Sequence, residues 1–596
     1  MYRTFKYIFL SIIAGAGLSA QAQTQTDTLR REVEVTRAFV PTISDANKLN
    51  SMPEIDEEQT EKPTFKYSIQ SQPVFSTFSF SPLKAATVET TPTIQRGYGL
   101  VRAGFGSYYK PYAEVFFNNV NSKNTIFGIH GKHLSSYGDI ELPGGDKVDA
   151  PFMHNEAELF VKHTIQTSVL SVNGAIKNDG FNYYGYPGEE GVQELLLRDD
   201  QQINYFGTKQ SFTQGSFHID LDDIGADIDE QEFGFSFDYH FFGTKTEQKE
   251  HFANFTTNFR APMQVGIGML EAGLEYTQAS NIFIPADTTL DKHSTTILFA
   301  KPAWYIGNET ANLKLGLGAW YIMDNTTDTE AKIAPEIRAN WAPVKEIINI
   351  YAGIDGEHIN NYYSKIAYEN PFVNPEHDVK SSMQKIRFYG GFDGKFSRKT
   401  AFKFSAEYSI TGDQPLYYLN ETFYPSTEIN PNPRIVDNTF AVLYDDIDRL
   451  KLNAEIFHAS SDKVDLSLSV NYYEYKTDKQ EEAWNLPNWD ATFSLGYKIS
   501  DQLSVSTDVY LMGECKALIL QSQDFDPAIP GITPDAVYKI NTLKTVFDLN
   551  LKANYQLTSK FSVFAQLNNF GFQQYEKWLG YPVQSMNALA GISYAF

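Results

Sequence analysis

Cysteine is almost absent from the chain. Cys515 is the single cysteine among 596 residues, so the chain can form no internal disulfide and no metal site built from a cysteine cluster. Long apolar runs are also missing beyond the N-terminus, and the mean hydropathy is −0.35. Because a membrane-spanning helix needs about 20 mostly apolar residues, the sequence excludes a helical membrane protein beyond its N-terminal segment.

Positive charge is scarce as well. The chain has 49 Lys and Arg residues against 73 Asp and Glu, which gives a formal net charge of −24. Such a balance repels phosphate backbones and excludes nucleic acid as an expected partner. Gly-x-Ser-x-Gly, His-Glu-x-x-His and phosphate-binding glycine motifs are missing too. We therefore expect no enzyme, no bound metal and no cofactor.

The N-terminus has the pattern of a secretory signal peptide. Arg3 and Lys6 precede an apolar stretch over residues 7–18, and Ala20-Gln21-Ala22 has the small-x-small pattern that signal peptidase cleaves. No cysteine follows this stretch, so a lipoprotein is not expected. We predict that residues 1–22 are removed and that the protein enters the cell envelope.

Segments of alternating polarity follow one another from about residue 98 onward. Each is near the length that a tilted strand needs to cross a bilayer. In the segment 464–473, for example, Val464, Leu466 and Leu468 alternate with polar residues. Aromatic residues make up 14% of the chain, a content that suits the aromatic girdles at both edges of a lipid-embedded barrel.

Short and long connections alternate along the chain. Short turns are predicted at residues 121–124, 165–167, 261–264, 343–347, 396–399, 461–463, 500–502 and 558–560, and long polar loops at 413–446, 476–487 and 517–540. Short periplasmic turns with long extracellular loops are typical of outer-membrane barrels, whereas a soluble sandwich has no reason to segregate its loops. We predict an all-β fold: a transmembrane antiparallel outer-membrane β-barrel of about 22 strands over residues 98–596.

The stretch 199–232 is the hardest to divide into strands. Parity requires an even number of strands between those near residues 168 and 249, so two are predicted there, with the acidic segment from Asp220 to Glu232 in the periplasm. Both termini are then periplasmic as well. A barrel of this size has a wide lumen that is normally plugged.

The last nine residues are predicted to form the final barrel strand. Ala588, Ala590, Ile592, Tyr594 and Phe596 share one face of a strand, and that face is apolar and aromatic, as a lipid-facing surface should be. We predict that Ile592, Tyr594 and Phe596 direct barrel assembly. They would also anchor the strand at the membrane edge.

The C-terminal hairpin resembles that of a known family. Its segments are Leu567-Asn568-Asn569-Phe570, then Tyr575-Glu576-Lys577-Trp578-Leu579-Gly580-Tyr581-Pro582, and Gly591-Ile592-Ser593-Tyr594-Ala595-Phe596. They resemble the last hairpin of TonB-dependent outer-membrane receptors, although Pro582-Val583-Gln584 stands where the family usually has Pro-Gly-Arg. The resemblance implies an outer-membrane receptor of a Gram-negative bacterium, surrounded by lipid, that binds or takes up an extracellular ligand.

A short stretch near the N-terminus is similar to the family's TonB box or first plug strand. It comprises Glu32, Val33, Glu34, Val35, Thr36 and Arg37. A β-prone strand on a tether can add itself to the sheet edge of another protein, and the resemblance implies a TonB-type periplasmic energy transducer as that protein. An ordinary exposed strand explains these six residues equally well.

The chain departs from the family in the length of its N-terminal segment. Residues 23–97 are rich in Thr, Ser, Pro and Gln, whereas the family's plug is a globular domain of well over a hundred residues. Three explanations are open. The segment is a reduced plug inside the lumen, the lumen is filled instead by loops or by a partner protein, or the protein has lost active transport. Two functions stay open: a receptor for uptake or binding, and a non-transporting scaffold of a complex with other outer-membrane or surface proteins.

Two polar groups in the stretch 216–232 invite functional interpretations. Ser216, His218 and Asp220 share a face, but residues two apart along a strand are about 6.6 Å apart, too far for a nucleophile to bond its base. Lining of the lumen explains them better. Seven carboxylates form the second group: Asp220, Asp222, Asp223, Asp227, Asp229, Glu230 and Glu232. Their spacing does not fit an EF-hand, which favours a solvated turn or a protein-docking patch.

Aromatic residues gather in two predicted loops. The loop 411–448 holds Tyr417, Tyr418, Phe423 and Tyr424, and a second loop holds Trp484. Exposed aromatics on a rigid scaffold are typical of a recognition surface for a sugar, a peptide or a protein. Packing of loop against loop, closing the barrel mouth, is the equally supported alternative.

Overall fold

The computed structural model describes residues 98–119, 124–143, 145, 147–185, 209–223, 231–280, 292–374, 379–424, 434–460, 463–522 and 536–596. The chain divides into two units, Met1–Glu61 and Lys62–Phe596, and all described residues belong to the second. The predicted signal peptide (1–22), the N-terminal segment 23–97 and the TonB-box-like residues 32–37 lie outside the described residues.

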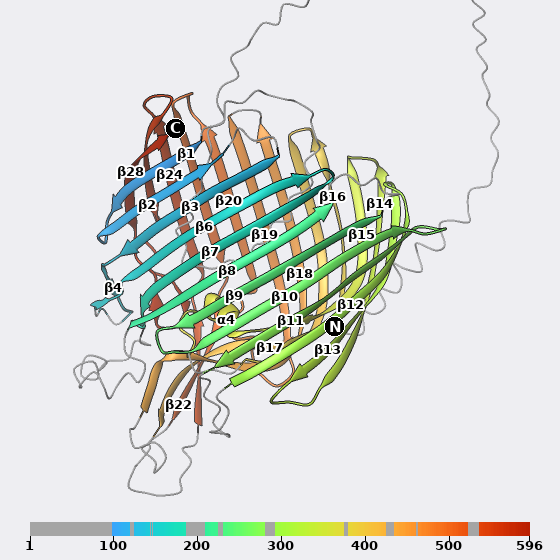
Figure 1. Ribbon diagram of the computed structural model, residues 1–596. Coiled ribbons are helices and arrows are strands. Elements are labelled where there is room, and N and C mark those ends of the chain that lie inside the picture. Colours follow the sequence, from blue (N-terminus) through green and yellow to red (C-terminus); the bar gives the residue numbers. More distant parts are fainter. Residues whose placement is uncertain are drawn as a thin grey trace, which may run out of the picture. The chain divides into compact units, whose positions relative to one another are not determined.

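The described strands form a closed antiparallel barrel of 22 strands (Figure 1). These are β1 (Gly99–Gly106), β2 (Lys110–Asn118), β3 (Thr125–Ser136), β6 (Phe152–Ile165), β7 (Ser168–Asn182), β8 (Lys209–Asp223), β9 (Glu232–Thr244), β10 (Lys249–Pro262), β11 (Ile267–Ser280), β12 (Lys292–Gly307), β13 (Ala311–Asp324), β14 (Glu330–Val344), β15 (Ile348–Ile359), β16 (Ser382–Ser397), β17 (Thr400–Tyr424), β18 (Arg434–Ser460), β19 (Val464–Thr477), β20 (Trp489–Lys498), β21 (Leu503–Met512), β24 (Val546–Gln556), β25 (Phe561–Asn568) and β28 (Asn587–Ala595). The predicted fold and strand number are confirmed. Two strands, β8 and β9, also lie between those near residues 168 and 249, as parity required. Their predicted placement is wrong in part, because β9 begins only at Glu232 and the acidic residues from Asp220 to Asp223 belong to β8.

The last strand closes the ring on the first. In the register of β28 with β1, Ile592 lies opposite Ala103 and Gly591 opposite Gly104. The backbone nitrogen of Gly99 donates to the carbonyl of Phe596 at 3.0 Å. A side chain at Gly591 would place its Cβ 2.2 Å from the carbonyl oxygen of Ala103, so the seam depends on a residue without one.

The wall strands alternate between an apolar outer face and an inner face that is largely polar but also carries buried apolar groups, such as the cluster of Ile297, Phe299 and Trp320 on β12 and β13. On β28, Ile592 is 59% exposed on the outside while Leu589, of opposite parity, is 3% exposed. On the inner face of β16, Arg387 forms a two-pronged ion pair with Asp355, with N···O distances of 2.6 and 2.7 Å. The outer face therefore suits lipid, and the lumen is lined with polar and charged groups.

The strands that the predicted short turns connect all have the ends next to these turns at one end of the barrel, together with the first residues of β1 and the last of β28. We call it the short-turn end, and the opposite one the long-loop end. A further short turn there, at residues 308–310, was not predicted. Two connections at the long-loop end, residues 107–109 and 245–248, are also short. The predicted separation of short turns at one end from long loops at the other is therefore found for most connections, but not for all of them.

Two predicted loops are wrong in part. Most of the predicted loop 413–446 is strand, because β17 and β18 continue past the wall to Tyr424 and from Arg434. The predicted loop 517–540 contains a hairpin, β22 (Cys515–Ser522) and β23 (Ala536–Leu543), which adds to this extension through a parallel pairing of β22 with β17. These segments lack a period-2 pattern, since Ala517, Leu518 and Ile519 are all buried, and three prolines lie between residues 425 and 433, which is why they were expected to be loops.

The remaining elements are small. They are β4 (Asp139–Glu141), β5 (Lys147–Asp149), helix α4 (Tyr363–Glu369), β26 (Glu576–Trp578) and β27 (Tyr581–Pro582). None of the helices in the described ranges has the length and apolar character needed to cross a membrane.

The orientation of the barrel is testable with single cysteines. If the short-turn end is periplasmic, Asp501→Cys should resist a membrane-impermeant maleimide on intact cells, whereas Glu481→Cys, in an exposed position at the long-loop end, should react. The native Cys515 gives little background, because it is 2% exposed and burial raises its pKa to about 12, which leaves almost no reactive thiolate at neutral pH.

Permeabilised cells provide the control, since both engineered cysteines should then react. Labelling of Asp501→Cys on intact cells, with Glu481→Cys protected, would invert the orientation.

Candidate functional site at the long-loop end

Three segments from well-separated strands of the ring meet at the long-loop end. They are residues 360–374 and 379–381 between β15 and β16, which we call loop 360–381, the loop 569–586 between β25 and β28, and residues 183–185 after β7. Segments that start so far apart on a closed ring can contact each other only by crossing its opening. We call this assembly the mouth bridge; α4, which belongs to it, lies within the outline of the barrel in Figure 1.

Helix α4 is held to the wall by a buried carboxylate. Glu250 on β10 is 0% exposed. It accepts hydrogen bonds from the hydroxyl of Ser364 at 2.6 Å and from the backbone nitrogen of Ser364 at 3.3 Å, at the start of the helix. His240 on β9 lies 3.2 Å from the same hydroxyl. A buried charge is tolerated where donors surround it, so this contact fixes the position of the first turn.

The three segments meet at two stacked rings. Phe372 and Tyr581 lie with centroids 3.5 Å apart and an interplanar angle of 18°. The hydroxyl of Tyr184 donates to the carbonyl of Pro582 at 2.9 Å, and the hydroxyl of Tyr581 donates to the carbonyl of Asn438 on β18. Each loop is thus bonded to another loop or to the extended strands, not only to its own neighbours.

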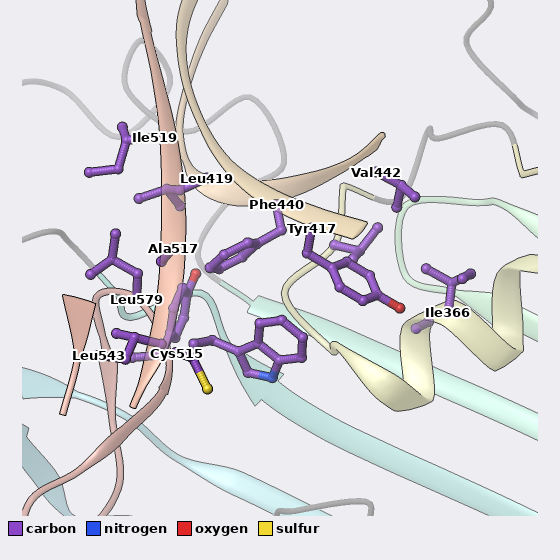
Figure 2. Packing of buried hydrophobic residues seen from close by; sticks show 14 of the residues in the cluster. Ile366, Tyr417, Leu419, Phe440, Val442, Cys515, Ala517, Ile519, Leu543 and Leu579 are labelled. Carbon is purple, nitrogen blue, oxygen red and sulfur yellow. The ribbon is translucent and has the colours of Figure 1, made fainter. Parts of the chain in front are cut away.

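The mouth bridge and the extended strands share one hydrophobic cluster. Tyr417 and Phe440 pack against Trp578 at centroid distances of 5.0 and 5.5 Å. Figure 2 shows these two residues of β17 and β18 beside Ala517 and Cys515 of β22. Aromatic packing of this kind adds about 0.5–1.5 kcal/mol per pair beyond area burial, so the cluster stabilises a closed arrangement.

The predicted aromatic recognition residues are only partly where they were expected. Tyr417 and Trp484 are 4% and 2% exposed, so their expected exposure is wrong. Tyr418 is half-buried, and the side chains of Phe423 and Tyr424 lie outside the described residues. The extension of β17, with β22 paired against it, buries what a loop would have exposed. For Tyr417 and Trp484 the structure agrees with the alternative that the loops pack against each other. Recognition of a ligand by the predicted aromatic residues stays a prediction.

The polar residues of β8 line the lumen. The Nδ1 atom of His218 lies 2.6 Å from a carboxylate oxygen of Asp238 on β9, and Phe217 between Ser216 and His218 is exposed on the outside. Asp227, Asp229 and Glu230 of the acidic segment lie outside the described residues. Within the described ranges, no group of three or more His, Cys, Asp or Glu residues could hold a metal ion.

A cavity of about 320 Å³ lies beside the mouth bridge. Its walls come from β10 to β17, from the connections 245–248 and 325–329, and from the loop 360–381. The cavity is not apparent from the sequence, because its residues come from strands in which they look like ordinary lumen-facing positions. A faint signal existed in the polar residues at the long-loop ends of consecutive strands, such as Thr277, His293 and Asp324.

Comparison with known proteins identifies the fold. No protein-family model and no curated protein matches the chain. Several solved structures do match. The pyoverdine outer-membrane receptor FpvA of Pseudomonas aeruginosa has a TM-score of 0.59 and 12% sequence identity, and the match covers 85% of this chain and 79% of that one. The FrpB iron transporter of Neisseria meningitidis, with a TM-score of 0.58, and the ferric-catecholate import receptor Fiu of E. coli K12, with a TM-score of 0.54, are each 10% identical and match over 84% of this chain and 82% of theirs. The predicted resemblance to outer-membrane receptors is confirmed for the barrel fold.

Cys515 reports whether the mouth bridge holds the cluster closed. Phe372→Ala with Tyr581→Ala removes the central stack, and truncation of a buried aromatic such as Tyr581 costs about 3–5 kcal/mol. Maleimide labelling of Cys515 in the purified protein should accelerate by at least about ten-fold, since local opening exposes the thiol.

The matched control is Phe570→Ala with Phe572→Ala, a pair on the same loop that is 39% and 62% exposed. These changes should leave the labelling rate near that of the unmodified protein. Equal rates for all three proteins would show that the bridge does not close the cluster.

Proposed function

We propose that this chain is an outer-membrane receptor-like barrel that binds an extracellular ligand at its long-loop end and delivers it inward. The observation that carries the proposal is the mouth bridge with its adjoining cavity, on a barrel whose fold is that of outer-membrane receptors. An ordered, concave surface built from the chain's own loops is what binding of a small ligand requires.

The wall of the barrel supports an outer-membrane location. Its outer face carries exposed apolar side chains such as Val101, Leu274 and Phe388, and its inner face carries ion pairs. Apolar groups facing outward in a closed ring of satisfied backbone bonds suit a lipid environment and would be costly in water. The long-loop end is then extracellular by the usual asymmetry of such barrels.

Energy for delivery would come from the periplasm. The stretch Glu32 to Arg37 has the β-prone alternation of an added strand, and a TonB-type transducer is the kind of partner that such a strand would engage. The segment 23–97 is short for a full plug, so we propose that the mouth bridge takes over part of its blocking role.

A non-transporting scaffold is the second candidate. It is favoured by β23, which pairs with β22 alone among the described strands and exposes Tyr538 and Ile540 at 65% and 43%. An exposed edge strand with apolar side chains is a ready template for another protein. Purification of the whole protein in mild detergent separates the two functions: recovery of a TonB-type transducer favours the receptor, and stable outer-membrane partners favour the scaffold.

Energy coupling is tested at the N-terminal stretch. Val33→Pro with Val35→Pro removes two backbone donors and fixes φ, so an added strand could no longer pair with a transducer. We expect loss of uptake or growth in a strain that depends on this protein, while the barrel still inserts in the outer membrane.

Val33→Ile is the matched control and should be silent, because an added strand is bound mostly through its backbone. Full rescue of a deletion phenotype by the double-proline variant would remove the coupling role and favour the scaffold.

Barrel assembly is tested at the other terminus. Tyr594→Ser with Phe596→Ser removes aromatic groups from the lipid-facing side of the closing strand, where they are proposed to anchor it at the interface. The yield of heat-modifiable, folded protein in outer-membrane fractions should fall sharply. A normal yield would show that Ile592 and the rest of the strand suffice.

A further inference from the structure

We propose that the cavity beside α4 binds a small organic cation rich in hydrogen-bond donors, of the chemical class of amino sugars. The inference rests on the proposed receptor function and names the ligand class of its site. It is carried by an unpaired buried amide, by the sign of the charges around the cavity, and by walls that are already fixed in place.

The unpaired amide belongs to Gln248. Its side chain is 1% exposed and lines the cavity, yet neither its amide nitrogen nor its amide oxygen has a hydrogen-bond partner within the described part of the chain. Its backbone is fixed, since the backbone nitrogen of Gln248 donates to the Thr244 hydroxyl at 3.2 Å and its carbonyl accepts a bond from the Thr244 backbone nitrogen at 2.9 Å. A buried polar group without a partner costs about 1–3 kcal/mol, which a ligand with both donors and acceptors would recover.

Negative charge predominates in the lining. The carboxylates are those of Glu250, Asp324, Asp328, Glu330 and Asp413, whereas the lysines are Lys332 and Lys380. Asp328 and Asp413 are exposed at the edge of the cavity. Carboxylates accept hydrogen bonds and cannot donate them, so they favour ammonium and hydroxyl groups. An anionic ligand would meet like charge at the entrance.

The cation is organic and not a metal ion. Asp324 is already saturated: its oxygens accept bonds from His293 at 2.7 Å and from the hydroxyls of Thr295 and Thr326 at 2.7 and 2.6 Å. Glu250 is engaged by Ser364. Within the described ranges the remaining carboxylates do not converge on one point as metal ligands would.

The walls are fixed before a ligand enters. Asn361 donates to the carbonyl of Lys380 at 3.0 Å and to the hydroxyl of Ser382 at 2.7 Å, and Asn360 donates to the hydroxyl of Thr277 at 3.1 Å. The loop is therefore fastened to β11 on one side and to β16 on the other. A volume of about 320 Å³ lies near the lower limit of small-molecule sites, about 300–1,000 Å³, which suits a mono- or disaccharide.

Calorimetry on the full chain in detergent tests the ligand class with three matched disaccharides. The β-1,4 dimer of glucosamine carries ammonium groups, N,N′-diacetylchitobiose is its neutral analogue, and digalacturonate is anionic. We expect the glucosamine dimer to bind about ten-fold more tightly than the neutral analogue, the ratio that one charge-assisted hydrogen bond supplies, and digalacturonate not to bind. Equal or tighter binding of digalacturonate, or no binding of the glucosamine dimer at millimolar concentration, would overturn the proposal.

Substitutions locate the site. Gln248→Met keeps the side-chain volume and removes an amide that has no partner; it should weaken binding about ten-fold and leave the unfolding temperature unchanged or higher, because an unpaired buried polar group is lost. Asp328→Asn with Asp413→Asn should weaken binding and reduce its salt dependence. The control is Asp501→Asn at the short-turn end, which should change neither. Undiminished binding by Gln248→Met would exclude the cavity as the site.

The proposed binding site and the proposed receptor function can be disproved independently of each other. If the dimer binds and Gln248→Met abolishes binding while cells lacking the protein show no uptake defect, the site stands and the receptor function falls. If uptake of another nutrient depends on the protein and is unaffected by Gln248→Met, the function stands and this cavity is not its binding site.

Discussion

The closed ring of backbone hydrogen bonds is the constraint on which the rest of the structure depends. In lipid an unpaired strand edge leaves donors and acceptors with no water to satisfy them, so β28 must meet β1. Gly591 opposite Gly104 permits the close approach of the two strands. Closure fixes the parity of every strand between them, and parity in turn decides which side chains face outward and which face the lumen.

A closed ring of this size also creates an interior that has to be filled, and the chain fills one end of it with its own loops. The rings of Phe372 and Tyr581 join segments from opposite parts of the wall, and the buried Glu250 holds α4 in place. The same loop that covers the mouth forms one wall of the cavity. Loop 360–381 therefore belongs both to the mouth bridge and to the wall of the cavity.

The sequence was informative wherever one rule acted locally. Alternation in the segment 464–473 predicted the strand β19, and parity predicted two strands where β8 and β9 lie, because an apolar outer face and a largely polar inner face leave a period of two. Prediction from the sequence failed where pairing between strands distant in sequence determines the local structure. Tyr417 and Trp484 resembled loop residues, since nothing local indicates that β22 pairs with β17. The cavity was missed because its lining comes from strands distant in sequence.

The parallel pairing of β17 with β22 has a consequence for the order of folding. It joins Tyr418 to Leu518, about one hundred residues apart along the chain, and closing so long a loop is entropically costly until the intervening strands have paired. The loop 569–586 requires the last two wall strands to be in place before it can reach Phe372. The extended sheet and the mouth bridge are therefore late products of folding, formed once the wall beneath them is complete.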